Sequence, residues 1–492
     1  MTGASEGLAT VSQMVAPGGR GWTGGRAPGR HRAPPVRGVA VLAAALALSA
    51  CGSALAAPGV TPRVAPSVPA LARPLSGFGL TPPGTGAGAG TTFLPGIPRF
   101  GGTGTGGATR IRPSDPVLST TATQPFYQVP SPLSPAPPGS IIRSETIPSD
   151  GQLPEGATAY RILYHSQSLT GADIAVSGIA VVPGGIPPAR GFPIVSWAHG
   201  TAGLAVQCAP SIWGPGSIPL LGSLLRHRAI VVATDYEGLG TPGPQPYLIG
   251  QGEAEGVLDA ARSARALVGA SASNTVIIVG YSQGGQAALF AGQMAQTYAP
   301  ELFVPGVAAV APVTSLDEFV PATPQQRTAK GLFALMALYA WSATYGNLPL
   351  ASLLTPLALQ DRAAIVSSCG GAAATRVANI PAGQLFRPGW DRDPVLAARI
   401  ADNEPGQVAT AAPMLVVQGT ADSVVPYATT TRFVADSLCG SQRDTVDYAA
   451  IEGAGHDSIL TAATSALMDW ITMRLANAPG TNSCARILTT TP

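Results

Sequence analysis

The sequence predicts an α/β fold built on a doubly wound, mostly parallel sheet, and three observations lead to this prediction. From about residue 125 onward, strand-like and helix-like segments alternate along the chain. Several strand-like segments are unbroken runs of valine and isoleucine, as in strands buried on both faces of a parallel sheet. A G-x-S-x-G sequence at residues 280–284 stands between such a run and a helix-like segment, the context of a sharp strand-to-helix turn.

The predicted elements follow from these patterns in chain order. We expect strands at 160–164, 174–182, 193–197, 229–234, 275–279, 306–311, 414–418 and 445–451. We expect helices at 255–268, 283–296, 427–438 and 458–475.

About a hundred helix-like residues interrupt this alternation before the strand at 414–418, and they include an apolar run at 331–341. An insertion of this size is expected above the C-terminal ends of the strands, where ligands bind in such sheets. We therefore expect a helical cap over the active site at about 313–405. The alternative is an ordinary buried helix pair packed on the sheet.

Composition excludes several classes of protein. Charged residues make up 11% of the 492-residue chain and hydrophobic residues 46%, whereas an average globular protein has about 25% charged residues. A charge-driven disordered protein is therefore excluded. The formal net charge is +2, and its positive excess lies in the first fifty residues, so no basic stripe suggests nucleic-acid binding.

The N-terminal part is expected to be an export signal followed by a tether. Residues 1–50 end in a short apolar run, 39–50, which is too short for a permanent membrane span. The sequence before Cys51 resembles a lipoprotein box, in which Cys51 would be lipidated; the alternative is an ordinary cleavage site at 54–56, and Met14 is a possible start. Residues 51–123, rich in proline and glycine, are expected to be a disordered tether in front of a catalytic domain at 124–492.

Four cysteines remain once the signal and Cys51 are set aside, and an even number in an exported chain suggests disulfides. Of the three possible pairings we favour Cys208 with Cys369 and Cys439 with Cys484; the alternative is four buried free thiols. No Cys or His spacing in the sequence indicates a metal site.

The G-x-S-x-G motif presents Ser282 as a candidate nucleophile, and a serine needs a base and a carboxylate to serve it. His456 is the only histidine downstream of Ser282, and it lies in a glycine-flanked loop after a predicted strand. Asp422 follows the strand predicted at 414–418 and completes the order Ser, Asp, His. The alternative role of Asp422 is a helix N-cap, and the weaker carboxylate candidates, inside the predicted cap, are Asp391, Asp393 and Glu404.

Acyl transfer also needs N–H donors for an oxyanion. One is expected to be the backbone N–H of Gln283, and the other that of Gly200 or Thr201, in the loop after the strand at 193–197. His199 is expected to be a structural loop residue, and His165 and His227 are expected at the surface.

These residues carry a family resemblance. Ser196-Trp197-Ala198-His199-Gly200-Thr201, Asp235-Tyr236-Glu237-Gly238-Leu239-Gly240 and Gly280-Tyr281-Ser282-Gln283-Gly284-Gly285 resemble motifs of the secretory lipases, the fungal lipase A type and its actinobacterial relatives. The resemblance implies an α/β-hydrolase fold with a helical cap, two disulfides, no cofactor, and hydrolysis of esters including triacylglycerols. It places Ser282, Asp422 and His456 in a catalytic triad, and we expect Tyr236, Glu237 and Tyr281 to shape the pocket.

The function expected from the sequence is thus a secreted or envelope-anchored serine ester hydrolase that acts on lipid esters through an acyl-enzyme. Its partners would be a lipid ester and, through the N-terminal lipid and tether, a membrane or cell wall. The alternatives are an envelope-lipid acyltransferase with the same triad, in which an alcohol replaces water, and a lipid carrier without catalysis.

Overall fold

A nine-stranded, mostly parallel sheet forms the centre of the fold. The computed structural model describes residues 124–490 except 149–150, 152, 321–328 and 378–379; the export signal, Cys51 and the tether lie outside the described residues. The sheet has the strand order β1-β2-β3-β5-β4-β6-β7-β8-β9. Its strands are β1 (Ile141–Ile147), β2 (Thr158–Gln167), β3 (Asp173–Val182), β4 (Phe192–Ala198), β5 (Ile230–Thr234), β6 (Ala272–Tyr281), β7 (Phe303–Val310), β8 (Met414–Gly419) and β9 (Val446–Ile451).

The predicted α/β fold class is confirmed, with a correction at the first edge of the sheet. From β5 through β4 to β9 every neighbouring pair is parallel, whereas the pairs β1–β2, β2–β3 and β3–β5 are antiparallel. The sequence analysis missed β1, because this edge strand is half exposed along its length and carries no buried apolar run. The central strands β5 and β8 are buried at every residue, as their valine and isoleucine content indicated.

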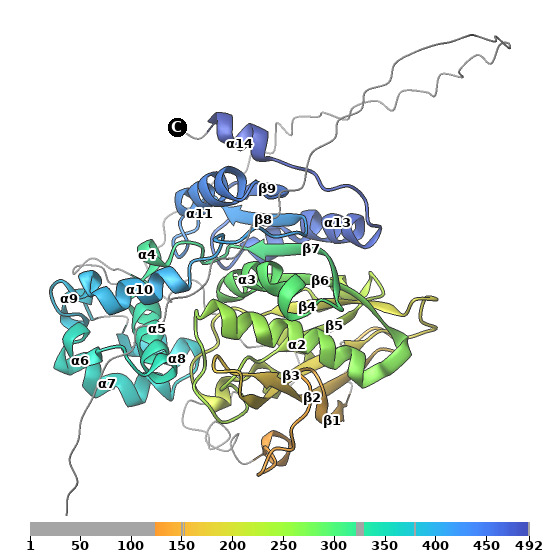
Figure 1. Cartoon of the computed structure of the whole chain (residues 1–492), viewed down its shortest axis with the longest axis horizontal. Coiled ribbons are helices and arrows are strands. Elements are labelled where there is room, and N and C mark those ends of the chain that lie inside the picture. The colour runs from red at the N-terminus through yellow and green to blue at the C-terminus, as the bar shows by residue number, and fades with distance from the viewer. Residues whose placement is uncertain (1–123, 149–150, 152, 321–328, 378–379, 491–492) are drawn as a thin grey trace, which may run out of the picture. The chain divides into compact units, whose positions relative to one another are not determined.

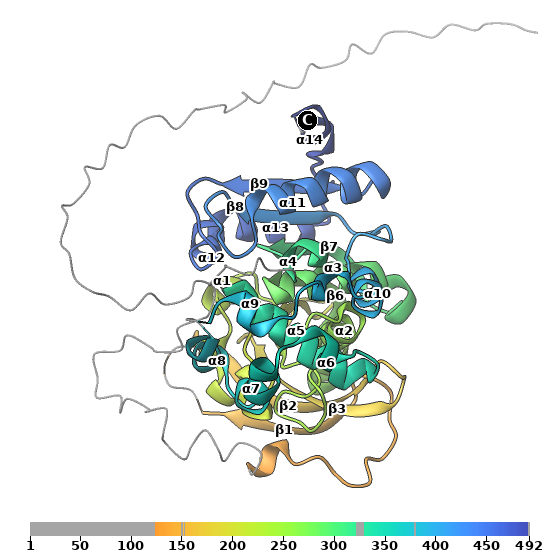
Figure 2. The ribbon, with the colours of Figure 1, turned by 90° about the vertical axis from the view of Figure 1, so that its left-hand side faces the viewer.

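Helices cover both faces of this sheet. One face packs against α2 (Gly250–Val268) and α3 (Gln283–Tyr298), and the other against α1 (Leu221–Leu225), α12 (Ile459–Ala462) and α13 (Thr464–Leu475), and Figure 2 shows the two groups on opposite sides of the strands. The helix predicted at 427–438 is α11 (Tyr427–Phe433) continued by a π-helical segment, η9 (Val434–Ser441). A last helix, α14 (Cys484–Thr490), is joined to η9 by the Cys439–Cys484 disulfide.

The segment between β7 and β8 is helical in its described parts, and its helices gather on one side of the sheet (Figure 1). They are α4 (Leu316–Phe319), α5 (Ala329–Tyr345), α6 (Leu350–Leu353), α7 (Pro356–Val366), α8 (Gly370–Val377), α9 (Ala382–Leu385), η8 (Trp390–Arg392) and α10 (Pro394–Asp402).

This insertion has an apolar core of its own. All ten residues of α5 from Leu332 to Trp341 are buried in it, so packing accounts for the apolar run at 331–341. The same core includes Leu204, Tyr247 and Val424, which lie in loops after β4, β5 and β8. The insertion therefore packs on the loops at the C-terminal ends of the strands. No helix of the described chain is both long and apolar enough to cross a membrane.

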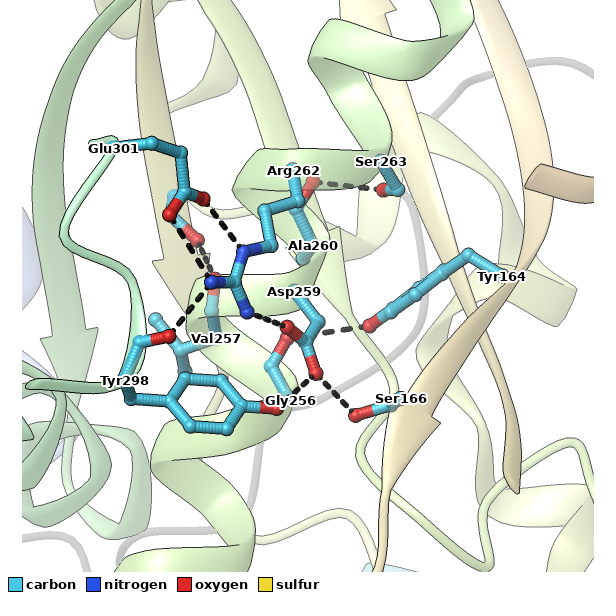
Figure 3. Close-up of polar contacts among 11 residues, drawn as sticks. Tyr164, Ser166, Gly256, Val257, Asp259, Ala260, Arg262, Ser263, Tyr298 and Glu301 are labelled. Atoms are coloured by element: carbon cyan, nitrogen blue, oxygen red, sulfur yellow. Dashed lines mark hydrogen bonds and ion pairs between the residues drawn. The ribbon is translucent and has the colours of Figure 1, made fainter. Parts of the chain in front are cut away.

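A buried polar network fixes α2 against β2 and α3 (Figure 3). Asp259, whose side chain is fully buried, accepts hydrogen bonds from Ser166 on β2 at 2.6 Å and from the Tyr298 hydroxyl on α3 at 2.8 Å. Arg262 donates to Asp259 at 2.9 Å and to Glu301 at 2.7 Å. Because each charged group has an opposite charge and further hydrogen bonds, α2 can carry these charges inside the fold.

Candidate active site

Ser282 lies at the turn from β6 into α3, in a conformation that few residues other than glycine adopt. Its φ is 58° and its ψ is −118°, a strained backbone of the kind found at functional turns. The two flanking glycines allow the strand and the helix to come this close. A Cβ at Gly280 would collide with the carbonyl group of Gly284, and a Cβ at Gly284 with that of Ala198 on β4.

The structure brings Ser282, His456 and Asp422 into one hydrogen-bonded chain. His456 Nε2 lies 2.9 Å from Ser282 Oγ, and His456 Nδ1 lies 2.7 Å from Asp422 Oδ2. A carboxylate only accepts hydrogen bonds, so Nδ1 donates to Asp422 and the neutral ring leaves Nε2 to accept from the serine hydroxyl. The arrangement can take a proton from Ser282 Oγ and stabilise the imidazolium that results.

Asp422 accepts four hydrogen bonds, of which one comes from the imidazole of His456. Its Oδ1 accepts from the backbone N–H groups of Val424 and Val425 at 2.8 and 2.9 Å, and its Oδ2 accepts from Gln418 Nε2 at 3.0 Å as well as from His456. The Asp422 side chain is fully buried. The sequence analysis overlooked Gln418; the available signal was a polar residue at the end of an otherwise apolar strand.

Tyr281, the residue before the serine, contacts the imidazole and its loop. Its hydroxyl donates to the backbone carbonyl of His456 at 2.9 Å, and the two rings have centroids 5.2 Å apart. The loop of His456 is also joined to the loop of Asp422, since Ala421 N donates to the Ala454 carbonyl at 3.1 Å. A backbone hydrogen bond thus joins the two loops, and the Tyr281 side chain holds the loop of His456 against the serine turn.

Three backbone N–H groups near Ser282 donate no hydrogen bond to any residue that the structure describes. Within the described chain, the N–H groups of Gly200, Thr201 and Gln283 donate no hydrogen bond. The loop with the first two lies beside the serine turn, since a Cβ at Gly200 would lie 3.1 Å from the Tyr281 ring. Unpaired donors of this kind can bind a developing negative charge.

Buried aromatic and histidine side chains support this loop. The Tyr236 hydroxyl donates to the His199 carbonyl at 3.1 Å, and the Tyr247 and Thr201 hydroxyls are 3.0 Å apart. His199 has its Nδ1 against the Gly200 carbonyl at 2.6 Å, and burial lowers its pKa to about 4. His199 is therefore neutral at ordinary pH, and its contacts are those of a structural residue. Tyr236 is fully buried and supports the loop through its hydrogen bond to His199.

The structure pairs Cys208 with Cys369 and Cys439 with Cys484, the pairing favoured from the sequence. The first disulfide joins the loop after β4 to the helical insertion. Next to it, Gly203 and Cys369 form a β-bridge, and Gly370 N donates to the Ala202 carbonyl at 2.9 Å.

Several candidate residues make no hydrogen bond to the triad within the described part of the chain. Glu404 accepts a hydrogen bond from the backbone N–H of Asp317 at 2.9 Å inside the insertion, and Asp393 caps α10. Among the described contacts, none joins Glu404, Asp393 or Asp391 to His456. Glu237 has no hydrogen bond to the triad or to the 199–201 loop within that part of the chain. The surface position expected for His165 is wrong: it is buried, and its Nδ1 lies 2.8 Å from Asp173.

Glu253, on the first turn of α2, is a further group next to the site. Its side chain is fully buried and contacts Gln283, although nothing in the sequence near it marked it as part of the site. Among the described residues, no group of three or more His, Cys, Asp or Glu side chains could hold a metal ion.

Comparison with known protein families and sequences finds similarity to lipases. The family model described as "Secretory lipase" matches residues 217–483, more than half of the chain. A probable inactive lipase of Mycobacterium tuberculosis is 28% identical over 205 residues, 39% of this chain and 46% of the relative. Lipase A of Moesziomyces aphidis is 26% identical over 212 residues, 40% of this chain and 44% of the relative. The matched segments thus span less than half of these two relatives.

Solved structures share the fold. Lipase A of Candida antarctica in its closed state superposes with a TM-score of 0.63 at 19% identity, over 76% of this chain and 91% of that one. A rice cell wall degrading esterase, LipA from Xanthomonas oryzae, has a TM-score of 0.59 at 19% identity, over 70% of this chain and 100% of that one. At this identity the likeness establishes the α/β-hydrolase fold.

Proposed function

Because this chain belongs to the secretory lipase family, we propose that it is a serine hydrolase of carboxylic esters, with lipid esters as its substrates. The observation that carries the proposal is the hydrogen-bonded chain Ser282–His456–Asp422, beside three N–H groups that have no partner among the described residues. Ser282 is the nucleophile, His456 the general base and acid, and Asp422 the group that orients the imidazole.

In the first half of the reaction, Ser282 Oγ attacks the ester carbonyl carbon while its proton moves to His456 Nε2. The tetrahedral intermediate collapses, the bond to the alcohol oxygen breaks, and the imidazolium protonates the departing alcohol. In the second half, His456 takes a proton from water, whose oxygen attacks the acyl-enzyme; the bond to Ser282 Oγ breaks, the serine regains its proton and the fatty acid leaves.

The tetrahedral oxyanion forms twice, and it requires N–H donors that have no other partner. The N–H of Gln283 supplies one, and the N–H of Gly200 or Thr201 supplies the other. The loss of a single donor of this kind typically costs about 10²- to 10³-fold in rate. The loop at 199–201 must therefore keep its N–H donor in a fixed position.

Lipid esters are favoured by the names of the relatives, which are lipases, and by the insertion at about 313–405 that packs on the loops around Ser282. One relative is named a probable inactive lipase. This chain has all three triad side chains at hydrogen-bond distance, and for that reason we propose an active enzyme.

We also propose that the enzyme works outside the cytoplasm. Two disulfides are typical of exported proteins, and residues 1–50 have the pattern of an export signal. Lipidation of Cys51 would anchor the catalytic domain, 124–492, to the envelope through the tether at 51–123.

Hydrolysis of p-nitrophenyl esters of increasing acyl length, followed by an emulsified triacylglycerol, tests the proposal. Wild type is expected to hydrolyse the esters and to react with a fluorophosphonate probe, and Ser282→Ala to lose about 10⁶-fold in kcat with unchanged thermal unfolding. Activity that survives in Ser282→Ala would exclude this nucleophile. Transfer of the acyl group to an added lipid alcohol in preference to water would favour an acyltransferase.

A further inference from the structure

A buried carboxyl group contacts the residue that follows the nucleophile. Glu253 Oε1 accepts a hydrogen bond from Gln283 Nε2 at 2.7 Å and another from the backbone N–H of Leu248 at 2.9 Å. Glu253 is fully buried, and its second oxygen, Oε2, has no hydrogen-bond partner in the described chain. Burying a carboxyl group with one oxygen left without a hydrogen bond costs free energy of folding, which suggests that Glu253 has a role beside the site.

We propose that Glu253 is a positioning residue for the oxyanion hole, which acts by holding the Gln283 side chain and the turn at Leu248. The inference rests on the proposed function, because it concerns the N–H of Gln283 that would bind the oxyanion. Gln283 has its own backbone fixed by the serine turn on one side and its side chain fixed by Glu253 on the other. Its N–H direction is then set from both ends.

The same carboxyl connects Gln283 to the turn at Leu248. Leu248, whose N–H bonds to Glu253, has a positive φ of 55°, a conformation that costs energy in a leucine. Its neighbour Tyr247 approaches Thr201 through its hydroxyl and accepts at its backbone carbonyl from Trp341 Nε1 on α5 at 2.9 Å. Glu253 thus holds the donor at Gln283 and the turn that supports Thr201.

Helix α2 is fixed along its length, so Glu253 cannot easily move. Its first residue, Gly250, donates to Asn403 at the end of α10 at 3.0 Å. Two turns beyond Glu253, the Asp259–Arg262 network anchors the helix to β2 and α3 (Figure 3). Glu253 is therefore presented to Gln283 by a rigid element, which is what a positioning residue requires.

Ionisation of Glu253 would oppose the reaction. Burial raises the pKa of Glu253 to about 8, and the two groups that favour its ionised form, the Gln283 amide and the Leu248 N–H, are both neutral. The titratable groups that face it are the hydroxyls of Tyr236 and Tyr247, and burial raises the pKa of both above the range in which Glu253 titrates. Above about pH 8, a negative charge would lie one side chain away from the N–H that binds the oxyanion, and the two negative charges would repel.

The test compares pH profiles of ester hydrolysis by the full chain and three variants. Glu253→Gln keeps an acceptor oxygen but cannot ionise, and Glu253→Ala removes the contact. Glu255→Gln is the matched control: it lies on the same helix, is buried, has its pKa raised to about 7 by burial, and bonds to Gln251 rather than Gln283.

We expect kcat of wild type and of Glu255→Gln to fall above about pH 8, and kcat of Glu253→Gln to show no such fall. The ratio of kcat at pH 9.5 to kcat at pH 7 should be roughly tenfold higher in Glu253→Gln than in wild type. Glu253→Ala is expected to lower kcat roughly 10- to 100-fold at all pH values with little change in KM, because the oxyanion contact exists only in the transition state.

Two results separate this inference from the proposed function. If hydrolysis depends on Ser282 but Glu253→Gln keeps the wild-type alkaline fall, or Glu253→Ala changes KM and not kcat, the role of Glu253 is wrong while the proposed function stands. If wild type shows no hydrolysis that depends on Ser282, the proposed function fails and this inference fails with it. Labelling of each variant by a fluorophosphonate probe serves as the control that Ser282 is still correctly placed and reactive.

Discussion

Close backbone approach governs the site at the scale of single residues. The serine turn exists because Gly280 and Gly284 have no Cβ, and a similar demand arises at the end of β8, where a Cβ at Gly419 would collide with the Ala454 carbonyl. Each of these glycines lets two backbone segments of the candidate site lie directly against each other. The strained φ of 58° at Ser282 is then maintained by the packing around it.

Substitution of Gly284 by alanine is expected to lower both activity and stability. The new Cβ would collide with the backbone of Ala198, and relief requires movement of β4 or α3, so the free energy of unfolding should fall by about 1–3 kcal/mol and kcat by at least about tenfold. Urea unfolding and p-nitrophenyl ester kinetics measure the two effects.

Gly222→Ala is the control for this prediction, because Gly222 is exposed on α1 and a Cβ there meets no atom within 4 Å. It should retain wild-type kinetics and unfold within about 0.5 kcal/mol of wild type. Equal behaviour of the two variants would show that the serine turn has room for a side chain.

At the scale of elements, the site depends on how the helical insertion is joined to the strand ends. The Cys208–Cys369 disulfide, the Gly203–Cys369 bridge and the Trp341–Tyr247 hydrogen bond all connect the insertion to loops around Ser282. The Cys439–Cys484 disulfide instead joins η9 to α14 at the C-terminal end of the chain. The two disulfides should therefore differ in their effect on catalysis.

Removal of each disulfide by paired alanine substitutions tests this difference. Either pair should cost about 2–5 kcal/mol of stability, with the larger loss for Cys208–Cys369, which spans 161 residues against 45. Only the loss of Cys208–Cys369 should lower kcat severalfold at a temperature where both variants are folded, because it frees the loop of Gly200 and Thr201. Circular dichroism verifies the folded state, and an equal fall in kcat in both variants would contradict the prediction.

At the scale of the whole molecule, the fold buries carboxyl groups without giving each one a positive partner. Burial raises the pKa of Glu237, Glu255 and Glu404 to about 7 and that of Glu253 to about 8. The folded chain holds these protons at a pH at which the unfolded chain has released them. The stability they contribute is full below about pH 4.5 and is lost as the pH rises through 7 to 8.

The melting temperature of wild type is therefore expected to fall between pH 6.5 and pH 8.5. The opposite contribution of His199, whose pKa is lowered, is complete above about pH 6.5 and does not act in this window. The variant Glu237→Gln/Glu255→Gln/Glu404→Gln should show a flatter profile in differential scanning calorimetry. A wild-type melting temperature that rises across this window would contradict the prediction.

Local patterns in the sequence determined the fold class, most of the strands and the three residues of the proposed triad, whereas the pairing of the cysteines, 161 and 45 residues apart, was decided by the tertiary structure. These features are encoded by neighbouring residues: apolar runs for buried strands, small residues around a strained serine, and the order Ser, Asp, His along the chain. The edge strand β1 was missed because its half-exposed residues carry no such pattern.

Tertiary structure alone decided which polar groups meet. Glu253 and Gln283 are separated by 30 residues, Trp341 and Tyr247 by 94, and nothing in the local sequence at any of them indicates the partner. The apolar run of α5, predicted from the sequence to belong to a helical cap, is buried in the core of the insertion itself. Burial and hydrogen bonding depend on segments that only the folded sheet brings together, and so the supports of the site, unlike its reacting groups, become visible only in three dimensions.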